Sequence, residues 1–164
     1  MELTANDALN ILREVMDPEV PVLDVVALGI VRGVEVVGDR ATVRVTPTYS
    51  GCPAMRVIER EIEAALVRRG LRQVTVQTVY SPPWTTDWLS DEAKERLRGY
   101  GIAPPGKVAD TPLVALGPTV RAAVACPYCG STETTLKSEF GATACKAIHV
   151  CQACRQPFEE FKAL

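Results

Sequence analysis

Four cysteines near the C-terminus constrain the fold of this chain more than any other feature. They form two Cys-x-x-Cys motifs, Cys126/Cys129 and Cys151/Cys154, and residues 130–150 separate the motifs. Two such pairs supply four thiolates, which is the ligand set of a closed tetrahedral zinc site. A rubredoxin-like iron site uses the same ligands, so the motifs predict a metal site and leave zinc and iron open.

The segment that carries these cysteines is short, and this makes metal binding a condition of its folding. Residues 124–164 amount to about forty, too few to bury a core that is stable without help. Structural zinc contributes on the order of ten kcal/mol of folding free energy to small modules. We therefore expect a zinc ribbon with short strands at residues 134–137, 149–150 and 158–161. The competing interpretation is a set of redox-active or simply buried thiols.

Two further residues lie close to the second motif and each has two interpretations. Cys145 precedes Cys151 by six residues. It is either an additional thiol that replaces a ligand or a buried small apolar residue, which is the commoner fate of a free cysteine. His149 could neighbour the metal, but the pattern favours an ordinary strand residue with one hydrogen bond.

His149 is also the only histidine in the chain, and this limits the chemistry that the chain can perform alone. A 2-His-1-carboxylate iron site needs two histidines, as does the di-iron site of helix bundles. A Ser-His-Asp triad would have to use His149, inside the predicted metal module. The glycines at 29–38 lack the spacing of a phosphate-binding loop. We therefore expect no enzyme active site in this chain.

Charge and hydropathy exclude several classes of partner. The net charge is −2, and residues 126–164 hold four basic and four acidic side chains. A balanced ribbon lacks the basic footprint that nucleic-acid binding requires, which leaves a structural or protein-docking role. No apolar run approaches the ~18 residues of a membrane span, and the N-terminus does not resemble a signal peptide. We expect a cytoplasmic protein, where Cys-x-x-Cys pairs favour metal over disulfides.

The first hundred residues alternate between helical and strand patterns. The pattern predicts, in chain order, a helix at 4–16, strands at 30–37 and 41–46, a helix at 53–69 and a strand at 73–80. Thr4 is the expected N-cap of the first helix, and Pro53 the first residue of the second. This order of elements is that of a compact α+β unit.

The remaining segments set the expected domain boundaries. A short helix at 90–100, capped by Ser90, closes the first domain. The next stretch is dense in glycine and proline, which is typical of a partly extended linker. The sequence thus predicts an α+β domain at 1–100, a Pro/Gly-rich linker at 101–123 and a four-cysteine zinc ribbon at 124–164.

A solitary cysteine in the first domain is a second candidate for chemistry. Cys52 lies between the second strand and the second helix, at the expected cap position of that helix. Unpaired N–H groups and the helix dipole at such a position lower a cysteine pKa, so Cys52 could bind metal, act as a nucleophile or simply cap the helix. Asp17 and Glu19 are either additional ligands or parts of a turn that holds a salt bridge.

Two tryptophans lie four residues apart in a proline-rich loop after the third strand. Trp84 and Trp88 could form a docking patch for a partner protein, because exposed tryptophans often anchor interfaces. The alternative is that both cover the end of the sheet as a satellite of the core. The spacing alone does not separate the two interpretations.

Several segments together resemble known families. Residues 17–22 (Asp-Pro-Glu-Val-Pro-Val), 28–31 (Leu-Gly-Ile-Val) and 48–53 (Thr-Tyr-Ser-Gly-Cys-Pro) are similar to the iron–sulfur assembly family, which includes SufT-like proteins. Residues 82–88 and 140–147 and the cysteine ribbon narrow the resemblance to the PaaD (or PaaJ) family of the phenylacetyl-CoA epoxidase system. The resemblance covers nearly the whole chain.

This resemblance implies an accessory protein of aerobic phenylacetate catabolism that is not itself a catalyst. It implies other subunits of the oxygenase or its reductase as partners, with a homodimer as a further expectation. It also implies transient iron or an iron–sulfur cluster at Cys52, beside Asp17 and Glu19, and it strengthens the case that Cys145 matters. Three alternatives stay open: a structural subunit that couples reductase to oxygenase, a thiol enzyme that uses Cys52, and a regulatory nucleic-acid binder, which the charge disfavours.

Overall fold

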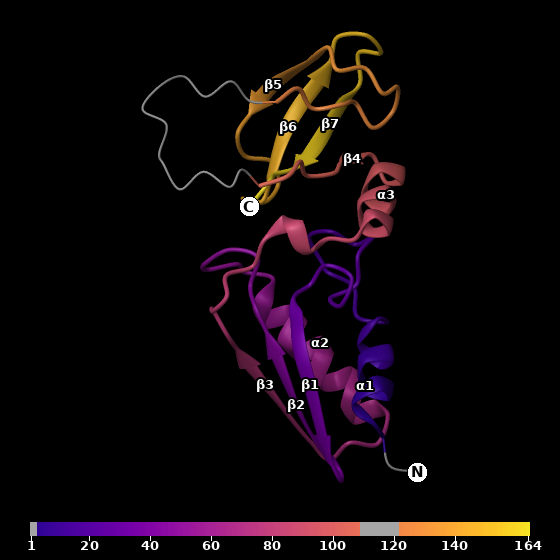
Figure 1. Cartoon of the computed structure of the whole chain (residues 1–164), viewed down its shortest axis with the longest axis vertical. Helices are drawn as coiled ribbons and strands as arrows, with labels where there is room; N and C mark the ends of the chain where they lie inside the picture. The colour runs from indigo at the N-terminus through magenta and orange to yellow at the C-terminus, as the bar shows by residue number, and fades with distance from the viewer. Residues whose placement is uncertain (1–2, 109–121) are drawn as a thin grey trace. The chain divides into compact units, whose positions relative to one another are not determined.

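The structure, a computed structural model, describes residues 3–108 and 122–164. The chain divides between Ala93 and Lys94 into two compact units, which are described one at a time. In Figure 1 the colours run from the indigo N-terminus of the first unit to the yellow C-terminus of the second. None of the helices within the described ranges is long and apolar enough to span a lipid bilayer.

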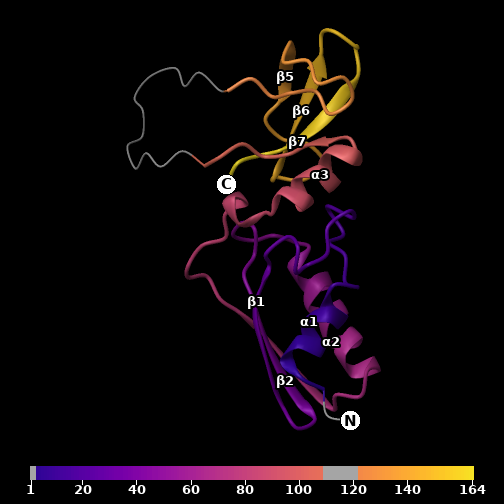
Figure 2. The ribbon, with the colours of Figure 1, turned by 45° about the vertical axis from the view of Figure 1, so that its right-hand side comes forward.

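The first unit is the α+β unit that the sequence predicts. Its elements are α1 (Ala5–Leu12), β1 (Val31–Val37), β2 (Arg40–Val45), α2 (Met55–Arg68), β3 (Gln73–Thr78) and the 3-10 turn η1 (Thr86–Trp88). The sheet has the order β1-β2-β3, with β2 antiparallel to β1 and parallel to β3. The parallel pair needs a crossover, which α2 supplies. Both α1 and α2 lie on one face of the sheet (Figures 1 and 2).

The core of this unit lies between that face and the helices. Alternate residues of β2 point inward, and Val43 and Val45 are completely buried. The facing stripe of α2 contributes Ile58 and Ile62, which are buried to a similar degree. Of the outward residues of β2, Arg40 and Arg44 are exposed and Thr42 is half-buried. The alternation that the sequence shows is therefore the alternation of a sheet covered on one side.

The bounds of α1 follow from contacts at its two ends. Thr4 caps α1 as predicted, because its side chain accepts the N–H of Asp7 while the Asp7 carboxylate accepts the N–H of Thr4. The helix ends at Leu12 and not at residue 16. Met16 instead forms an isolated β-bridge with Asp24, which a helical backbone would not allow.

The start of α2 also differs from the prediction. The helix begins at Met55, with Ala54 as N-cap, so Pro53 lies before the helix and not at its first position. Cys52 is therefore not the cap residue. The N-cap makes no side-chain hydrogen bond, since alanine has no group to supply one.

The second unit contains a four-stranded sheet. It includes most of α3 (Asp91–Gly99), followed by β4 (Ile102–Ala103), β5 (Thr134–Ser138), β6 (Lys146–Cys151) and β7 (Pro157–Phe161). The order is β4-β7-β6-β5; β4 runs parallel to β7, and the other neighbours are antiparallel. The three predicted ribbon strands correspond to β5, β6 and β7. Ser90 caps α3 as expected, since its hydroxyl accepts the N–H of Ala93.

The range predicted as a linker contains a strand. Ile102 and Ala103 form β4 on the edge of the ribbon sheet, and both side chains are buried. Two apolar residues gain more by burial against β7 than by exposure in a linker. Most of the predicted linker, residues 109–121, lies outside the described residues.

Candidate functional site

The four motif cysteines lie on two loops of the second unit that repeat one hydrogen-bonding pattern. In the first loop the N–H of Gly130 donates to the carbonyl of Cys126, at 2.9 Å. In the second the N–H of Arg155 donates to the carbonyl of Cys151, at 3.1 Å. Gly130 and Arg155 both have a positive φ, which turns the chain back after each motif. The two loops are thus equivalent knuckles that face a common centre.

The sulfur atoms of these knuckles fit a tetrahedral metal site. All four Sγ atoms lie within 4.8 Å of one another. Two pairs from different motifs are closer: Cys126 to Cys154 at 3.7 Å and Cys129 to Cys151 at 3.6 Å. A tetrahedron with metal–sulfur bonds of about 2.3 Å has edges of about 3.8 Å. The four cysteines that the sequence singles out are therefore brought together at the spacing that such a metal needs.

The acid–base properties of the sulfur atoms also favour a cation. The N–H groups of Cys154 and Ala153 donate to Cys151 and, with the neighbouring thiols, lower its pKa to about 7 against desolvation. The N–H of Gln156 likewise lowers the pKa of Cys154, but desolvation and the surrounding cysteines outweigh this effect and raise the pKa of Cys154 to about 12. Four thiolates at this spacing repel one another, so all four ionise together only around a positive charge.

The other two residues near the second motif take no part in this cluster. Cys145 is buried, and its sulfur lies 3.1 Å from the hydroxyl of Thr143, which fits the interpretation of a small buried residue. His149 is also buried; its Nε2 lies 2.7 Å from a carboxylate oxygen of Glu160, and its ring stacks on Phe158. Both positions therefore fit the ordinary structural role better than a role as metal ligands.

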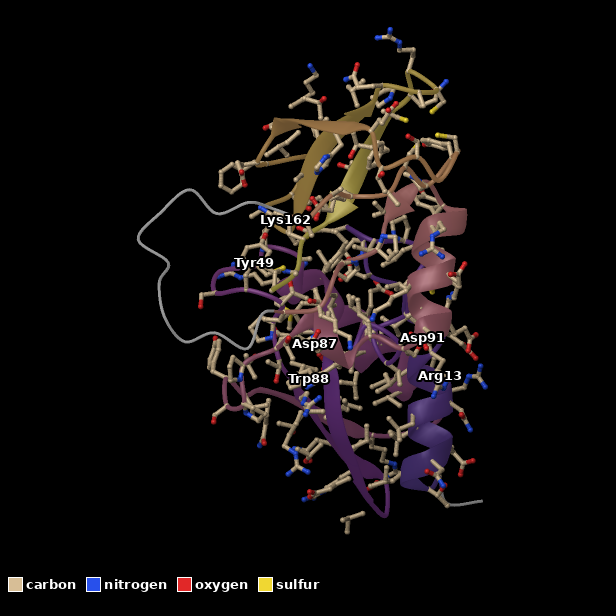
Figure 3. The ribbon with its side chains drawn as sticks, turned by 45° about the horizontal axis from the view of Figure 1, so that its top comes forward. Arg13, Tyr49, Asp87, Trp88, Asp91 and Lys162 are labelled. Carbon is tan, nitrogen blue, oxygen red and sulfur yellow. The ribbon has the colours of Figure 1, made fainter. Side chains whose placement is uncertain are left out.

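Cys52 lies on the loop between β2 and α2, where the structure corrects the predicted environment. The predicted helix cap would lower the pKa of Cys52, but the pKa is raised. Partial burial is the largest cause, and the negative charge of Glu19 adds to it. The N–H of Ala54 and the hydroxyls of Tyr49 and Thr48 donate to the sulfur and only partly offset these effects. Figure 3 labels Tyr49 on this loop.

The two predicted carboxylates differ in what they do. Asp17 is buried, and one of its oxygens accepts the N–H groups of Glu19 and Val20, at 2.7 and 2.8 Å. It therefore shapes the Asp-Pro-Glu turn. Glu19 is half-buried and lies near enough to Cys52 to act on the charge of that thiol. Of the two carboxylates, Glu19 is the one whose charge acts on the Cys52 thiol.

The hydroxyls beside Cys52 are functional groups that the sequence interpretation missed. Thr48 and Tyr49 belong to the Thr-Tyr-Ser-Gly-Cys segment, so their place in the chain is the available signal. The loop folds back through a hydrogen bond from the N–H of Cys52 to the carbonyl of Tyr49, at 3.3 Å. This turn is what brings hydroxyls that precede the thiol into reach of it.

The tryptophans do not form an exposed patch. Trp84 is 5% exposed, and its indole N–H donates to the carbonyl of Leu28 at 2.9 Å. Trp88 is half-buried, and the guanidinium of Arg32 lies 3.8 Å from the centre of its ring. The prediction of a docking patch is wrong for Trp84, because a buried indole with a satisfied N–H belongs to the core.

Two family models match this chain, and they match different parts of it. The model described as an iron–sulfur cluster assembly protein matches residues 6–79, and the one described as a PaaD zinc beta ribbon domain matches residues 112–162. The first match contains Cys52 and the second contains all four ribbon cysteines. Each of the two candidate sites thus lies within a different family match.

Curated relatives divide in the same way. A protein of Escherichia coli (strain K12), named as a subunit of 1,2-phenylacetyl-CoA epoxidase, is 46% identical over 94% of this chain and 90% of its own length. An Fe-S protein maturation auxiliary factor of Bacillus subtilis (strain 168) is 36% identical over 58% of this chain and 95% of its own length. The first relative matches most of this chain and so spans both units, whereas the second matches over 98 residues, which is about the length of the first unit.

Solved structures support the fold of the first unit. A domain of unknown function, DUF59, from Bacillus anthracis has a TM-score of 0.54 at 30% identity, covering 57% of this chain and 90% of that one. A conserved hypothetical protein from Thermotoga maritima has a TM-score of 0.51 at 34% identity, covering 58% and 95%. The α+β unit is therefore a fold that also occurs without the ribbon.

Removing one ribbon cysteine should abolish metal binding by the second unit. We expect Cys126→Ser to lose the metal and to unfold the ribbon, because three ligands cannot close the site and the core is small. Cys145→Ala, a matched control at a buried cysteine outside the cluster, should keep about one metal ion per chain. Elemental analysis by mass spectrometry measures both. Equal metal content in the two variants would contradict the assigned ligand set.

The raised pKa of Cys52 predicts a slow, strongly pH-dependent reaction with alkylating agents. In a Cys145→Ala background with the ribbon metal bound, alkylation by iodoacetamide should increase through a pH above the ordinary thiol value of 9.0. Glu19→Gln should shift this profile to lower pH, because it removes a negative charge that disfavours the thiolate. Peptide mass spectrometry follows the reaction. A profile that Glu19→Gln leaves unmoved would exclude the electrostatic contact.

Proposed function

This chain belongs to the PaaD family of 1,2-phenylacetyl-CoA epoxidase subunits, and we propose that it is an accessory protein that is not a catalyst. Its role in this proposal is to help assemble an iron or iron–sulfur centre in the oxygenase or in its reductase. Those proteins are the proposed partners, in the cytoplasm. The relative named as an epoxidase subunit and the maturation factors that match the first unit together support this role.

The observation that carries the proposal is the loop at residues 46–54, between β2 and α2, which holds Cys52 and is called the thiol loop below. Cys52 is half-buried, with a carboxylate near it and hydroxyl groups that donate to its sulfur. Thiolate and carboxylate groups are both iron ligands. This loop lies in the unit that corresponds to almost the whole length of the maturation factors, so the function named for them requires no ribbon.

A single thiol suits transfer better than storage. Iron–sulfur clusters are commonly held by four cysteine thiolates. The thiol loop offers one, because four of the other cysteines form the ribbon cluster and Cys145 is buried in the ribbon unit. A cluster or ion at Cys52 would therefore take its other ligands from the donor or the client. Such incomplete ligation favours release once the client supplies better ligands.

Protonation also favours a transient site. The raised pKa keeps Cys52 a neutral thiol near neutral pH, and a metal must displace that proton in order to bind. Iron binding at this loop should therefore strengthen as the pH rises. The nearby Glu19 carboxylate raises the cost of the free thiolate, but it would stabilise a bound cation.

We assign zinc to the ribbon and a structural role to that zinc. The four thiolates form a closed set, so no position is left for a substrate or for a second protein ligand. The family description of this segment as a zinc beta ribbon supports zinc over iron.

A structural subunit that couples reductase to oxygenase is the second candidate. A shallow groove of the ribbon unit, lined by Tyr100, Tyr128 and Phe158, favours it. Both tyrosines are 58% exposed, and exposed aromatic side chains are common anchors of protein interfaces. This role differs from maturation because it requires the protein at every turnover.

Anaerobic reconstitution with iron and sulfide tests the thiol loop directly. We expect the wild type and Cys52→Ser to hold about one zinc per chain each, and only the wild type to retain iron. Elemental analysis and the visible absorption spectrum measure the two metals. Iron bound equally by Cys52→Ser would contradict the proposal, and iron with a rubredoxin-like spectrum would identify the ribbon as its site.

Turnover by the fully loaded oxygenase system separates the two candidate roles. If this chain is a maturation factor, oxygenase and reductase that already hold their iron and clusters should turn over at an unchanged rate without it. The matched control is the same system purified from cells that lack this chain, which should be deficient in metal. A stoichiometric requirement in the fully loaded system would overturn maturation in favour of the coupling role.

A further inference from the structure

The ribbon unit contains a cavity that neither the metal site nor the thiol loop uses. Its volume is about 680 Å³, and it lies among α3, the segment after β4, and strands β5 to β7. This volume falls within the range of about 300–1,000 Å³ that is usual for small-molecule sites. Most of the lining residues are small or apolar, among them Ala103, Pro104, Val124 and Leu136, and polar groups contribute much of the remaining surface.

The charged groups of this cavity are mostly cations. Lys94, Arg98 and Lys107 line it, against a single carboxylate, that of Glu160. Arg98 is paired with Glu95 on the exposed side of α3. Within the described ranges, neither lysine forms an ion pair. The two lysines are therefore the cations that a ligand could engage at little cost in existing contacts.

The one carboxylate of the cavity is already engaged. Nε2 of His149 lies 2.7 Å from Glu160, and the two side chains are only 6% and 13% exposed. This bond occupies one oxygen of Glu160, so the only carboxylate of the lining already has a partner, while three cationic side chains line the same cavity. His149 also lines the cavity, and its Nδ1 has no hydrogen-bond partner among the described residues. Buried polar atoms without partners are rare in folded proteins, and they often occur where a ligand or an ordered water belongs.

We propose that this cavity binds a small organic anion with an apolar body, its head group held by Lys94 and Lys107. The apolar lining would take a chain or ring, while the lysines would take a carboxylate or a phosphate. Such a ligand would stabilise the ribbon unit at a place separate from the four cysteines. This site does not depend on the role that we propose for Cys52.

A ligand series on the zinc-loaded full-length chain tests this site. Hexanoate, hexyl phosphate and hexanol share one apolar chain and differ in the head group. Titrations followed by amide chemical shifts should show saturable changes at lining residues such as Ala103 and Leu136 for the anions. Hexanol should bind about tenfold more weakly or worse. Tighter binding of hexyl phosphate would identify a phosphate head group, and tighter binding of hexanoate a carboxylate.

A pair of charge-matched variants makes the test specific to the cavity. The double variant Lys94→Gln/Lys107→Gln should raise the Kd of the better-bound anion about tenfold, whereas Arg60→Gln/Lys137→Gln should leave it unchanged. All four positions lie outside the two cores, so folding should persist, and elemental zinc confirms the ribbon in each variant. The proposal is overturned by equal Kd values in the two variants, by hexanol binding as tightly as the anions, or by an absence of saturable shifts at the lining residues.

Discussion

The convergence of four sulfur atoms on one point is the constraint on which the ribbon unit depends. Cys126 and Cys151 belong to the cluster of four sulfur atoms, and they also form a buried apolar cluster with Ala103 and Phe158. A unit as short as Lys94–Leu164 gains too little from apolar burial alone to offset the conformational entropy of its chain. Binding of a metal by the four cysteines would therefore be coupled to folding of this unit, because two of the residues that would hold the metal are also residues that pack.

The same constraint explains why the ribbon strands β5, β6 and β7 are predictable from the sequence while the edge strand β4 is not. Cysteine spacing fixes the knuckles, and the strands beside them follow from the chain length between the motifs. The strand β4 carries no comparable signal, since two apolar residues in a stretch rich in glycine and proline form a strand only through β7, far along the chain. The backbone of Arg155 is equally hard to predict. Arg155 has a positive φ, as Gly130 has in the first knuckle, but a positive φ is uncommon for residues other than glycine.

In the first unit, local hydrogen bonds and the alternation of buried residues are predictable, but contacts between distant segments are not. The Thr4 capping box involves residues three apart, so the sequence contains all of it. The environment of Cys52 depends instead on where α2 begins and on Glu19, which comes from a different loop. A shift of two residues in the helix start changes the expected cap into a turn, and partial burial then reverses the direction of the pKa shift. Trp84 follows the same logic, since its partner, the carbonyl of Leu28, is distant in sequence.

The two thiol sites differ in the number of sulfur ligands they offer, and this number determines how firmly each site would hold a metal ion. A metal held by four thiolates of one unit stays bound when a single metal–sulfur bond breaks, because the other three bonds keep it in place until the fourth re-forms. A lone thiol near a carboxylate has no such reserve, and its raised pKa adds competition from protons. In the proposed role, the ribbon would fill first from a shared supply of zinc, and Cys52 would stay available for cargo that a partner helps to ligate. The proposal therefore rests on the difference in sulfur number, which would let one chain hold zinc permanently in the ribbon and a second metal transiently at Cys52.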